Sequence, residues 1–247
     1  MLETLGIVQS CHIQDVSRSK FARRLGGKSV LEWIVRRASE CQRLDGIVVV
    51  LADNPEGERL AELVPSDVPV VLGSQHDPLA RVTAALAQFP AHAAVKINVG
   101  FPFIDPALID RLVNTAVAHP ASDYISYCAR NGRPAILSPV GVFGEWFRAK
   151  ALQKAERDAK LAADREQITR YLYTHPEKFN LRLIPTPAEL DRDDLRLSID
   201  SEEDWELAST ILDALGPEQL EWQKIAGLLD HQPELRERMA ELNRAGI

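Results

Sequence analysis

Short β-branched runs alternate with helical patterns over the first half of the chain, and this alternation restricts the fold more than any other feature. The runs lie at 5–9, 47–51, 68–72, 93–98 and 124–127. Each run is too short for a helix and is bounded by turn residues, which is typical of sheet strands. Strands that alternate with helices through short connections are parallel and have right-handed crossovers. The sequence therefore predicts an α/β fold, a mostly parallel twisted sheet with helices on both faces.

Four helix starts are marked by capping residues. Asn54, Asp77 and Asp105 each precede a proline, and Ser201 precedes three acidic residues. A short polar side chain caps the first turn, and proline fits the first helical position because its missing N–H has no partner there. Carboxylates over a helix N-terminus are also favourable. These signals predict helices that begin directly after each of the four residues.

The second half of the chain is less regular. We expect strands at 139–143, 181–184 and 195–199, and helices at 145–163 and 166–174. Two amphipathic segments, 218–229 and 233–244, follow Gly216-Pro217 and predict a C-terminal helical hairpin. The expected organisation is a main α/β domain over 1–216 and a helical hairpin over 217–247.

Charge and cysteine content restrict the partners and the compartment. The chain has 29 Lys and Arg against 36 Asp and Glu, a net charge of −7. Nucleic-acid wrapping and binding to anionic membranes both need a basic surface, so we expect neither partner. Cys11, Cys41 and Cys128 are widely spaced and form no metal or redox motif. With no signal peptide and no stretch long enough to span a membrane, we expect a cytoplasmic protein.

A basic segment follows the first predicted strand. Arg18, Lys20, Arg23, Arg24 and Lys28 lie close together there in an otherwise acidic chain. Ligands of parallel α/β sheets bind beyond the carboxyl ends of the strands, so this segment is a candidate phosphate site. A solvated basic loop is the alternative. The two commonest phosphate loops, G-x-x-x-x-G-K-[ST] and G-x-G-x-x-G, do not occur in the sequence.

Cys11 and His12 stand side by side directly after the first predicted strand. A Cys/His nucleophile pair is one interpretation, but neighbouring residues of a strand point to opposite faces. A plain packed cysteine is the simpler interpretation.

Several short stretches, taken in order, resemble one family. They are 7–9 with Lys20, 25–34, 73–74 with 77–81, 102–106, 165–166 with Thr169 and Tyr173, 175–179, 198–200 with 203–204, and 228–229 with 233–235 and Asn243. These motifs resemble the cytidylyltransferases related to spore coat polysaccharide biosynthesis protein F, a branch of the group that activates octulosonate and sialic acids. The resemblance covers nearly the whole chain. It implies a Rossmann-like nucleotide-diphospho-sugar transferase fold that is usually a homodimer.

The resemblance also implies a reaction. In this family a sugar hydroxyl attacks the α-phosphate of CTP, pyrophosphate leaves, and a CMP-sugar of glycan or surface polysaccharide biosynthesis results. Mg²⁺ bound by two aspartates neutralises the developing charge. Carried over residue by residue, the nucleotide-binding positions are Gln9, Ser10, Lys20, Ser74, Asp77 and Arg81, the catalytic ones Lys20 and Arg18, and the metal ligand Asp200.

The sequence departs from the family at the positions that carry the chemistry. In an alignment without gaps, the two arginines of the family's first loop fall on Cys11 and Val16, and the first metal aspartate falls on Gly100. The family's sugar-binding stretch, G-L-D-V-E-V, falls on 137–142, where neither acid is present. Losing several charge-stabilising groups costs many decades of rate. We therefore favour a catalytically degenerate protein that keeps a nucleotide- and sugar-binding fold, with an active CTP-dependent transferase as the alternative.

Overall fold

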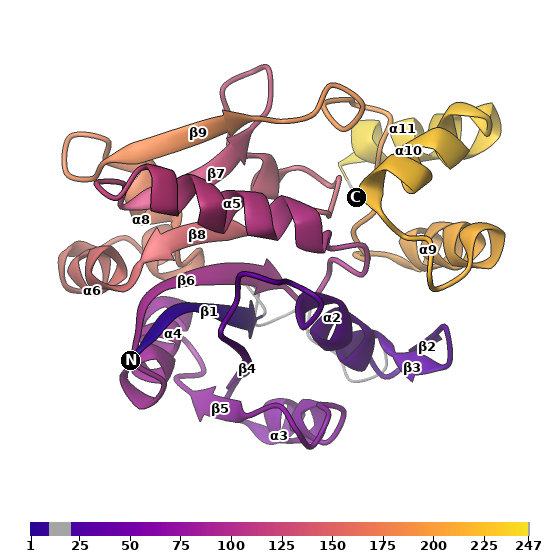
Figure 1. The fold of residues 1–247 in the computed structure, drawn as a ribbon. Helices are drawn as coiled ribbons and strands as arrows, with labels where there is room; N and C mark the ends of the chain where they lie inside the picture. The colour runs from indigo at the N-terminus through magenta and orange to yellow at the C-terminus, as the bar shows by residue number, and fades with distance from the viewer. Residues whose placement is uncertain (10–20, 247) are drawn as a thin grey trace.

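The computed structural model describes residues 1–9 and 21–246, which form one mixed sheet with helices on both faces (Figure 1). The strands are β1 Leu2–Gln9, β2 Arg24–Leu25, β3 Lys28–Ser29, β4 Gly46–Ala52, β5 Val70–Gly73, β6 Ala91–Asn98, β7 Tyr124–Cys128, β8 Glu145–Arg148 and β9 Leu181–Pro185. The helices are α2 Val30–Ala38, α3 Pro55–Ala61, α4 Pro78–Gln88, α5 Pro106–Ala118, α6 Ala149–Asp158, α7 Ala162–Glu166, α8 Arg170–Thr174, α9 Glu202–Leu215, α10 Trp222–Asp230 and α11 Pro233–Ala245, with a 3₁₀ turn at Ala135–Leu137.

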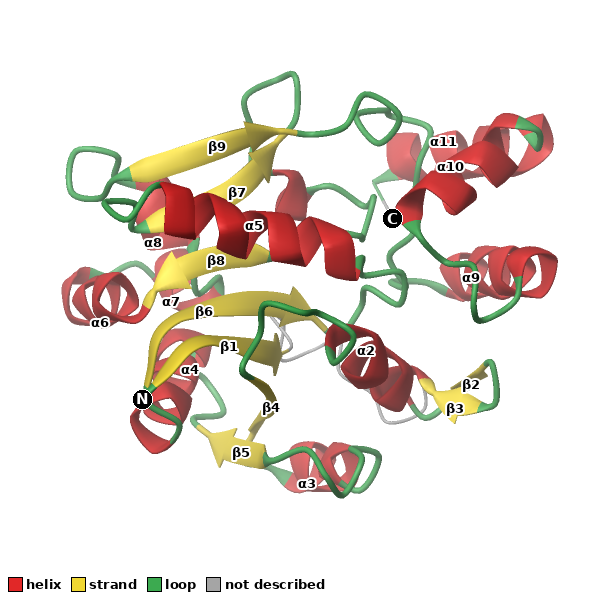
Figure 2. Cartoon of the chain, in the orientation of Figure 1, coloured by secondary structure: helices red, strands yellow, loops and turns green. Residues whose placement is uncertain are grey.

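The main sheet has the strand order β5-β4-β1-β6-β8-β7-β9, and β2 pairs with β3 in a small separate hairpin (Figure 2). Neighbouring strands are parallel except at β8, which is antiparallel to both β6 and β7. The five strands predicted in the first half of the chain are all present. The predicted Rossmann-like α/β architecture is therefore confirmed, with β8 as a strand that the strand–helix alternation did not predict.

Two apolar cores lie on opposite faces of the sheet. One contains α2, α5 and buried residues of the C-terminal helices, and the other contains α4, α6 and α8. Alternate residues of β1 enter different cores, since Ile7 packs in one and Val8 in the other. A strand that is buried on both faces reads as a continuous apolar run, which is why the short runs were recognisable in the sequence.

The predicted helix starts are confirmed. The side chains of Asn54, Asp77 and Asp105 each accept a hydrogen bond from a backbone N–H in the first turn of α3, α4 and α5. Ser201 and Asp204 form a reciprocal capping box at the start of α9. Three of these helices follow strands β4, β5 and β6, so the caps determine where the chain leaves the carboxyl edge of the sheet.

Four predicted elements of the second half differ from the structure. The helix expected over 145–163 is strand β8 followed by α6 and the start of α7, because Trp146 and Phe147 pack into opposite cores. The helix expected over 166–174 begins only at Arg170. The strands expected at 139–143 and 195–199 are absent from the described chain, where these segments cross each other as irregular backbone.

Backbone hydrogen bonds hold these two crossing segments. The N–H groups of Leu197 and Ser198 both donate to the carbonyl of Pro139, and the N–H of Ile199 donates to the carbonyl of Gly100. Gly141 has a φ of +67°, and a Cβ there would lie 2.7 Å from the backbone nitrogen of Ser198. A glycine is therefore required at position 141 for the close approach of the two segments. The apolar residues of 139–143 and 195–199 pack in the core instead of pairing as strands.

The C-terminal helices α10 and α11 pack against the main domain. Leu220, Ile225, Leu229 and Met239 are buried in the same apolar core as α2 and α5. Asp105 also accepts a hydrogen bond from the backbone N–H of Trp222, at 2.9 Å. The two predicted helices are present, and the boundary at residue 217 stays a prediction. Within the described residues, no helix has both the length and the apolar character needed to cross a membrane.

Candidate functional site

A cavity of about 740 Å³ opens at the carboxyl end of β6. Its walls come from the end of β6, the 3₁₀ turn, the segment between α7 and α8, and residues 192–200, and the end of α11 closes one side. Strand β8 runs antiparallel to β6, so its first residue, Glu145, lies opposite Lys96 at this edge. The cavity therefore occupies the edge of the sheet where ligands of parallel α/β folds bind.

A buried ion pair lies beneath the cavity. Lys96 Nζ is 3.0 Å from Glu145 Oε2, and the two residues are 4% and 0% exposed. Thr169 Oγ1 donates to the same carboxylate oxygen at 2.8 Å, and the hydroxyl of Tyr124 donates to the other oxygen. Burial, together with the nearby charge of Glu145, raises the pKa of Tyr124 well above its usual range, so this hydroxyl stays a donor. Several partners offset the cost of burying the charges.

Part of the polar wall beside this pair comes from the motif at 165–166 with Thr169 and Tyr173 that resembles the family. Gln167, Thr169 and Tyr173 line the cavity, and the Tyr173 hydroxyl donates to Gln167 Oε1 at 3.3 Å. Burial, and secondarily the charge of Glu145, raises the pKa of Tyr173. Arg165, from the same motif, points elsewhere and binds Asp77. The structure thus places Thr169 and Tyr173 of this motif in the cavity wall and Arg165 in a contact elsewhere.

Glu145 is the residue of this site that sequence reasoning missed. The alignment without gaps put the family's G-L-D-V-E-V stretch on 137–142 and found neither acid there. Moving the same pattern four residues along sets its glycine on Gly141 and its second acid on Glu145. The structure places Glu145 under the cavity and residues 137–139 along its wall. The signal that could have found it is this four-residue shift.

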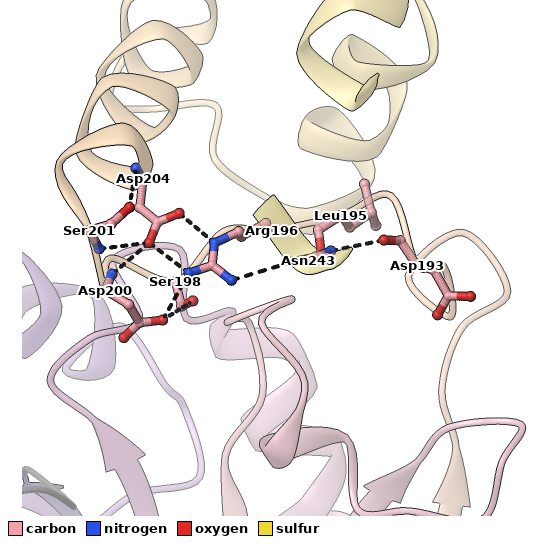
Figure 3. A network of polar contacts seen from close by, with 8 residues as sticks. All are labelled: Asp193, Leu195, Arg196, Ser198, Asp200, Ser201, Asp204 and Asn243. Carbon is pink, nitrogen blue, oxygen red and sulfur yellow. Dashed lines mark hydrogen bonds and ion pairs between the residues drawn. The ribbon is translucent and has the colours of Figure 1, made fainter. Parts of the chain in front are cut away.

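Asp200 lies at the other side of the cavity, directly before α9. Its side chain is 58% exposed, and one carboxylate oxygen accepts a hydrogen bond from Ser198 Oγ at 2.7 Å. The buried pair of Arg196 and Asp204 lies next to Asp200 (Figure 3). Asp204 Oδ2 accepts the backbone N–H groups of both Asp200 and Ser201 at 2.8 Å. The turn that carries Asp200 is therefore held rigidly in place.

The charge of Asp204 is stabilised in spite of its burial. Burial alone would raise the pKa of this carboxyl group. Hydrogen bonds from Arg196 and from the N–H groups of Asp200 and Ser201 outweigh that effect, so the pKa of Asp204 lies below its usual value. Charge-assisted hydrogen bonds of this kind are stronger than neutral ones.

The C-terminal helix reaches the same corner. Asn243 of α11 donates to the carbonyl oxygens of Asp193 and Leu195, at 2.8 and 3.0 Å (Figure 3). Its own side-chain oxygen lies 3.4 Å from Arg196 Nη1. The tail that resembles the family's ending thus fixes the segment leading to Asp200.

Gly100, where the resemblance expects the first metal aspartate, lies next to Asp200. A Cβ built on Gly100 would be 3.9 Å from Asp200 Oδ1, and its nearest neighbour would be Asn98 Oδ1 at 3.5 Å. A side chain at position 100 would fit without a clash and would bring a second carboxylate to Asp200. Among the described residues no group of three or more His, Cys, Asp or Glu side chains could hold a metal ion.

The predicted nucleotide-binding residues have other partners. Gln9 is fully buried at the end of β1. Asp77 caps α4 and accepts a hydrogen bond from Arg165 Nε at 2.7 Å, and Arg81, 3% exposed, donates to the carbonyl of Ser74 at 2.9 Å. These four residues do not line the cavity. Their role in binding nucleotide stays a prediction.

The predicted phosphate segment is only partly described. Ser10, Cys11, His12, Arg18 and Lys20 lie outside the described residues. Of the rest, Arg23 forms a two-pronged ion pair with Glu202 at 2.7 and 2.6 Å, and Arg24 donates to the carbonyl of Gly27. Lys28 lies over the ring of Trp33. The described end of the segment is therefore bound to the protein surface.

Residues 14–176 match the family described as the MobA-like NTP transferase domain. The chain belongs to this family. Among curated relatives of this NTP transferase, an uncharacterised protein of Methanocaldococcus jannaschii, MJ1063, is 28% identical over 95% of this chain and 93% of its own length. The spore coat polysaccharide biosynthesis protein SpsF of Bacillus subtilis is 24% identical over 95% of this chain and 97% of its own length. The resemblance drawn from the sequence motifs is thereby confirmed.

Solved structures support the same fold for this NTP transferase. A cytidylyltransferase from Leptospira borgpetersenii has a TM-score of 0.81 at 21% identity and covers 95% of both chains. CMP:2-keto-3-deoxy-manno-octonic acid synthetase, solved with CTP, has a TM-score of 0.64 at 12% identity, over 86% of this chain and 99% of its own. A manganese complex of Rv0371C from Mycobacterium tuberculosis has a TM-score of 0.57 at 16% identity, over 83% and 96%. Related nucleotidyltransferase structures thus include a CTP complex and a divalent metal complex.

The donor set of this NTP transferase is compatible with a divalent cation. Asp200 presents an exposed carboxylate to the cavity, and the backbone at Gly100 leaves open space beside it. Mg²⁺ in phosphoryl-transfer sites is commonly held by one or two carboxylates together with phosphates and water. When bound there, such an ion neutralises charge on the phosphates and on the leaving group.

Proposed function

We propose that this protein binds CTP and a sugar in the manner of the cytidylyltransferases of glycan or surface polysaccharide biosynthesis, but transfers the cytidylyl group slowly or not at all. The observation that carries the proposal is Gly100, which leaves Asp200 as the one carboxylate among the described residues at the expected metal position. A positioned charge-stabilising group contributes on the order of 3 to 4 kcal/mol to a reaction barrier. The loss of one such group costs about two to three decades of rate.

The cavity supports retained sugar binding. Its volume lies within the usual range for small-molecule sites, and its walls combine apolar and polar side chains as such sites do. The ion pair of Lys96 and Glu145 and the groups around it give one wall fixed hydrogen-bonding groups. The proposed sugar site is this cavity, with the cytidine phosphates near the end of β1, Lys20 and Arg18.

An active CTP-dependent transferase is the second candidate. The buried Glu145 favours it, because an acid predicted to be lost lies beneath the cavity, paired with Lys96 of the cavity wall. In this candidate Asp200 holds Mg²⁺, and the protein positions a sugar hydroxyl in line with the α-phosphate of CTP. For both candidates we propose a homodimer in the cytoplasm, as the resemblance suggests.

Two measurements test the proposed function. Calorimetric titration with CTP, with and without Mg²⁺, measures nucleotide binding. A lack of binding at millimolar CTP would contradict both candidate functions. Pyrophosphate release from CTP, Mg²⁺ and a panel of sugars then separates them. Release at the rates usual for enzymes, about 1 to 1,000 per second, would refute the degenerate protein.

The Gly100→Asp variant sharpens this test. Gly100 does not have a positive φ, and a Cβ there has no contact closer than 3.5 Å, so the variant should fold. If the missing carboxylate limits the reaction, the variant should release pyrophosphate about 100-fold faster than the wild type. Gly46→Asp is a matched control, because a Cβ at Gly46 meets no atom within 4 Å and Gly46 does not line the cavity.

A further inference from the structure

Oxygen atoms lie nearest to the space left by Gly100. The three atoms nearest to a Cβ built at this position are Asn98 Oδ1, the carbonyl oxygen of Ile199 and Asp200 Oδ1, at 3.5, 3.7 and 3.9 Å. Neither a carbon nor a nitrogen atom is among these three neighbours. Three oxygen atoms close to one small space are the kind of donor set that Mg²⁺ and Mn²⁺ prefer.

Asn98 is positioned to contribute to such a site. It is the last residue of β6, where it pairs with Gln9 of β1, and its side chain lines the same cavity as Asp200. Asn98 Oδ1 accepts the backbone N–H of Gly100 at 2.9 Å, which fixes the direction of the amide group. An amide oxygen has two acceptor sites, so this hydrogen bond leaves it able to bind a cation.

We propose that Asn98 Oδ1 is the second protein ligand of the divalent cation at this site, beside Asp200, in place of the aspartate expected at position 100. The proposal rests on the proposed function only in that the cation belongs to the nucleotide site. Glycine at position 100 then leaves the space between Asn98 and Asp200 open to the cation. The motif around Gly100, which lacks the expected aspartate, is then a metal site with a different second ligand.

This metal site has a distinct electrostatic property. An amide oxygen carries no net charge, so the protein offers the cation one negative charge instead of two. Metal affinity in oxygen sites rises with the number of charged ligands. The free protein should therefore bind the cation weakly, and nucleotide phosphates should supply the remaining negative charge and ligands.

A purely structural role for Asn98 is the competing explanation. The hydrogen bond from Asn98 to the N–H of Gly100 closes a turn, which would itself account for an asparagine there. Asn98→Asp separates the two explanations, because an aspartate keeps the acceptor for Gly100 and adds one charge. The turn is preserved, and only the interaction with a cation changes.

The test is a titration with Mn²⁺ alone, followed by electron paramagnetic resonance of the free ion. Asn98→Asp should bind Mn²⁺ about tenfold more tightly than the wild type, because it adds a charged ligand. Asn98→Ala and Asp200→Asn should each weaken Mn²⁺ binding about tenfold. Circular dichroism of each variant confirms that it is folded.

Asp193→Asn is the matched control. Asp193 is exposed and also lines the cavity, but it lies on the far side of Arg196 and Asn243 from Asp200 (Figure 3). The substitution removes one charge from the same cavity and should change Mn²⁺ affinity by less than about twofold, as expected for a screened surface charge. An equal effect of Asp193→Asn and Asp200→Asn would overturn the proposal, because the cavity would then attract Mn²⁺ only through its general charge.

The outcomes for the ligand and for the function can be told apart. If Asn98→Asp binds Mn²⁺ no more tightly than the wild type does, Asn98 is not a ligand. The same conclusion follows if neither protein binds Mn²⁺ measurably. An unchanged affinity in Asn98→Ala, where the wild type is measurable, overturns it too. CTP binding in the presence of EDTA tests the proposed nucleotide site without any metal.

Discussion

Two arginine–carboxylate pairs at helix N-termini have different consequences in this protein. Asp77 caps α4 and binds Arg165, and both side chains are about a quarter exposed, at 26% and 25%. Asp204 lies in the first turn of α9 and binds Arg196, with exposed fractions of 0% and 4%. The first pair joins helices away from the cavity, whereas the second supports the turn of Asp200 at its wall.

The comparison shows what a capping carboxylate can and cannot indicate. In the sequence both aspartates stand in motifs that resemble the family, and the resemblance alone made Asp77 a candidate ligand of the nucleotide. In the structure both aspartates are bound by arginine and by backbone N–H groups. The difference between them comes from burial and from which residues stand next to the cavity.

The largest expected effect comes from breaking the buried pair. Arg196→Met leaves the charge of Asp204 buried without its main partner, which should lower the free energy of unfolding by about 3 to 5 kcal/mol. Urea denaturation followed by circular dichroism measures this change. Arg23→Met is the control, because the ion pair of Arg23 and Glu202 is exposed and should contribute less than about 1 kcal/mol. Similar losses in both variants would mean that burial does not distinguish the two ion pairs.

An intermediate effect is expected at the more exposed pair. Asp77→Ala removes a helix cap and the partner of Arg165, and together these should cost about 2 kcal/mol of unfolding free energy. Asp77→Asn keeps a capping oxygen and should cost about half as much. CTP affinity of the folded Asp77→Ala variant should be unchanged if the role of Asp77 is structural. A clear loss of CTP affinity would show that Asp77 contributes to nucleotide binding and would contradict the purely structural role that distinguishes it from Asp204.

The smallest effect is a dependence of stability on acid pH. The pKa of Asp204 is lower in the folded protein than in the unfolded chain, so the unfolded chain takes up this proton first as the pH falls. The contribution to stability is complete above the unfolded pKa, about 3.9, and is lost as the pH falls through the folded pKa. Carbon-detected NMR titration should find a pKa below this value for Asp204. Arg196→Met should raise that pKa, and an unchanged pKa in the variant would contradict the role of the arginine.

The sequence predicted the first half of the fold better than the second. The runs at 5–9, 47–51 and 93–98 are buried on both faces, and the helices that follow the last two runs have local caps. Such signals lie within a few neighbouring residues and need no knowledge of the remaining chain. Strand β8 lacked a comparable signal, because its four residues become a strand only by pairing with β6 and β7.

The residues of the candidate site likewise divide into those that the sequence predicted and those that only the fold brings together. Asp200 was predicted as a metal ligand from the family resemblance, which includes the motif at 198–200 with 203–204. Glu145 was missed because its position depends on the antiparallel register that sets it opposite Lys96. Asn98 drew no attention in the sequence, since only the fold brings the end of β6 next to the segment that carries Asp200.

By itself, the sequence determined the alternating α/β order, the helix starts, the family and the glycine at position 100. Each of these depends on local residue types and spacing. The tertiary structure decided that β8 enters the sheet antiparallel, that Glu145 lies beneath a cavity, and that three oxygen atoms lie nearest to the space beside Gly100. Those features depend on contacts between residues far apart in the chain, where strand register and packing, not local preference, set which groups meet.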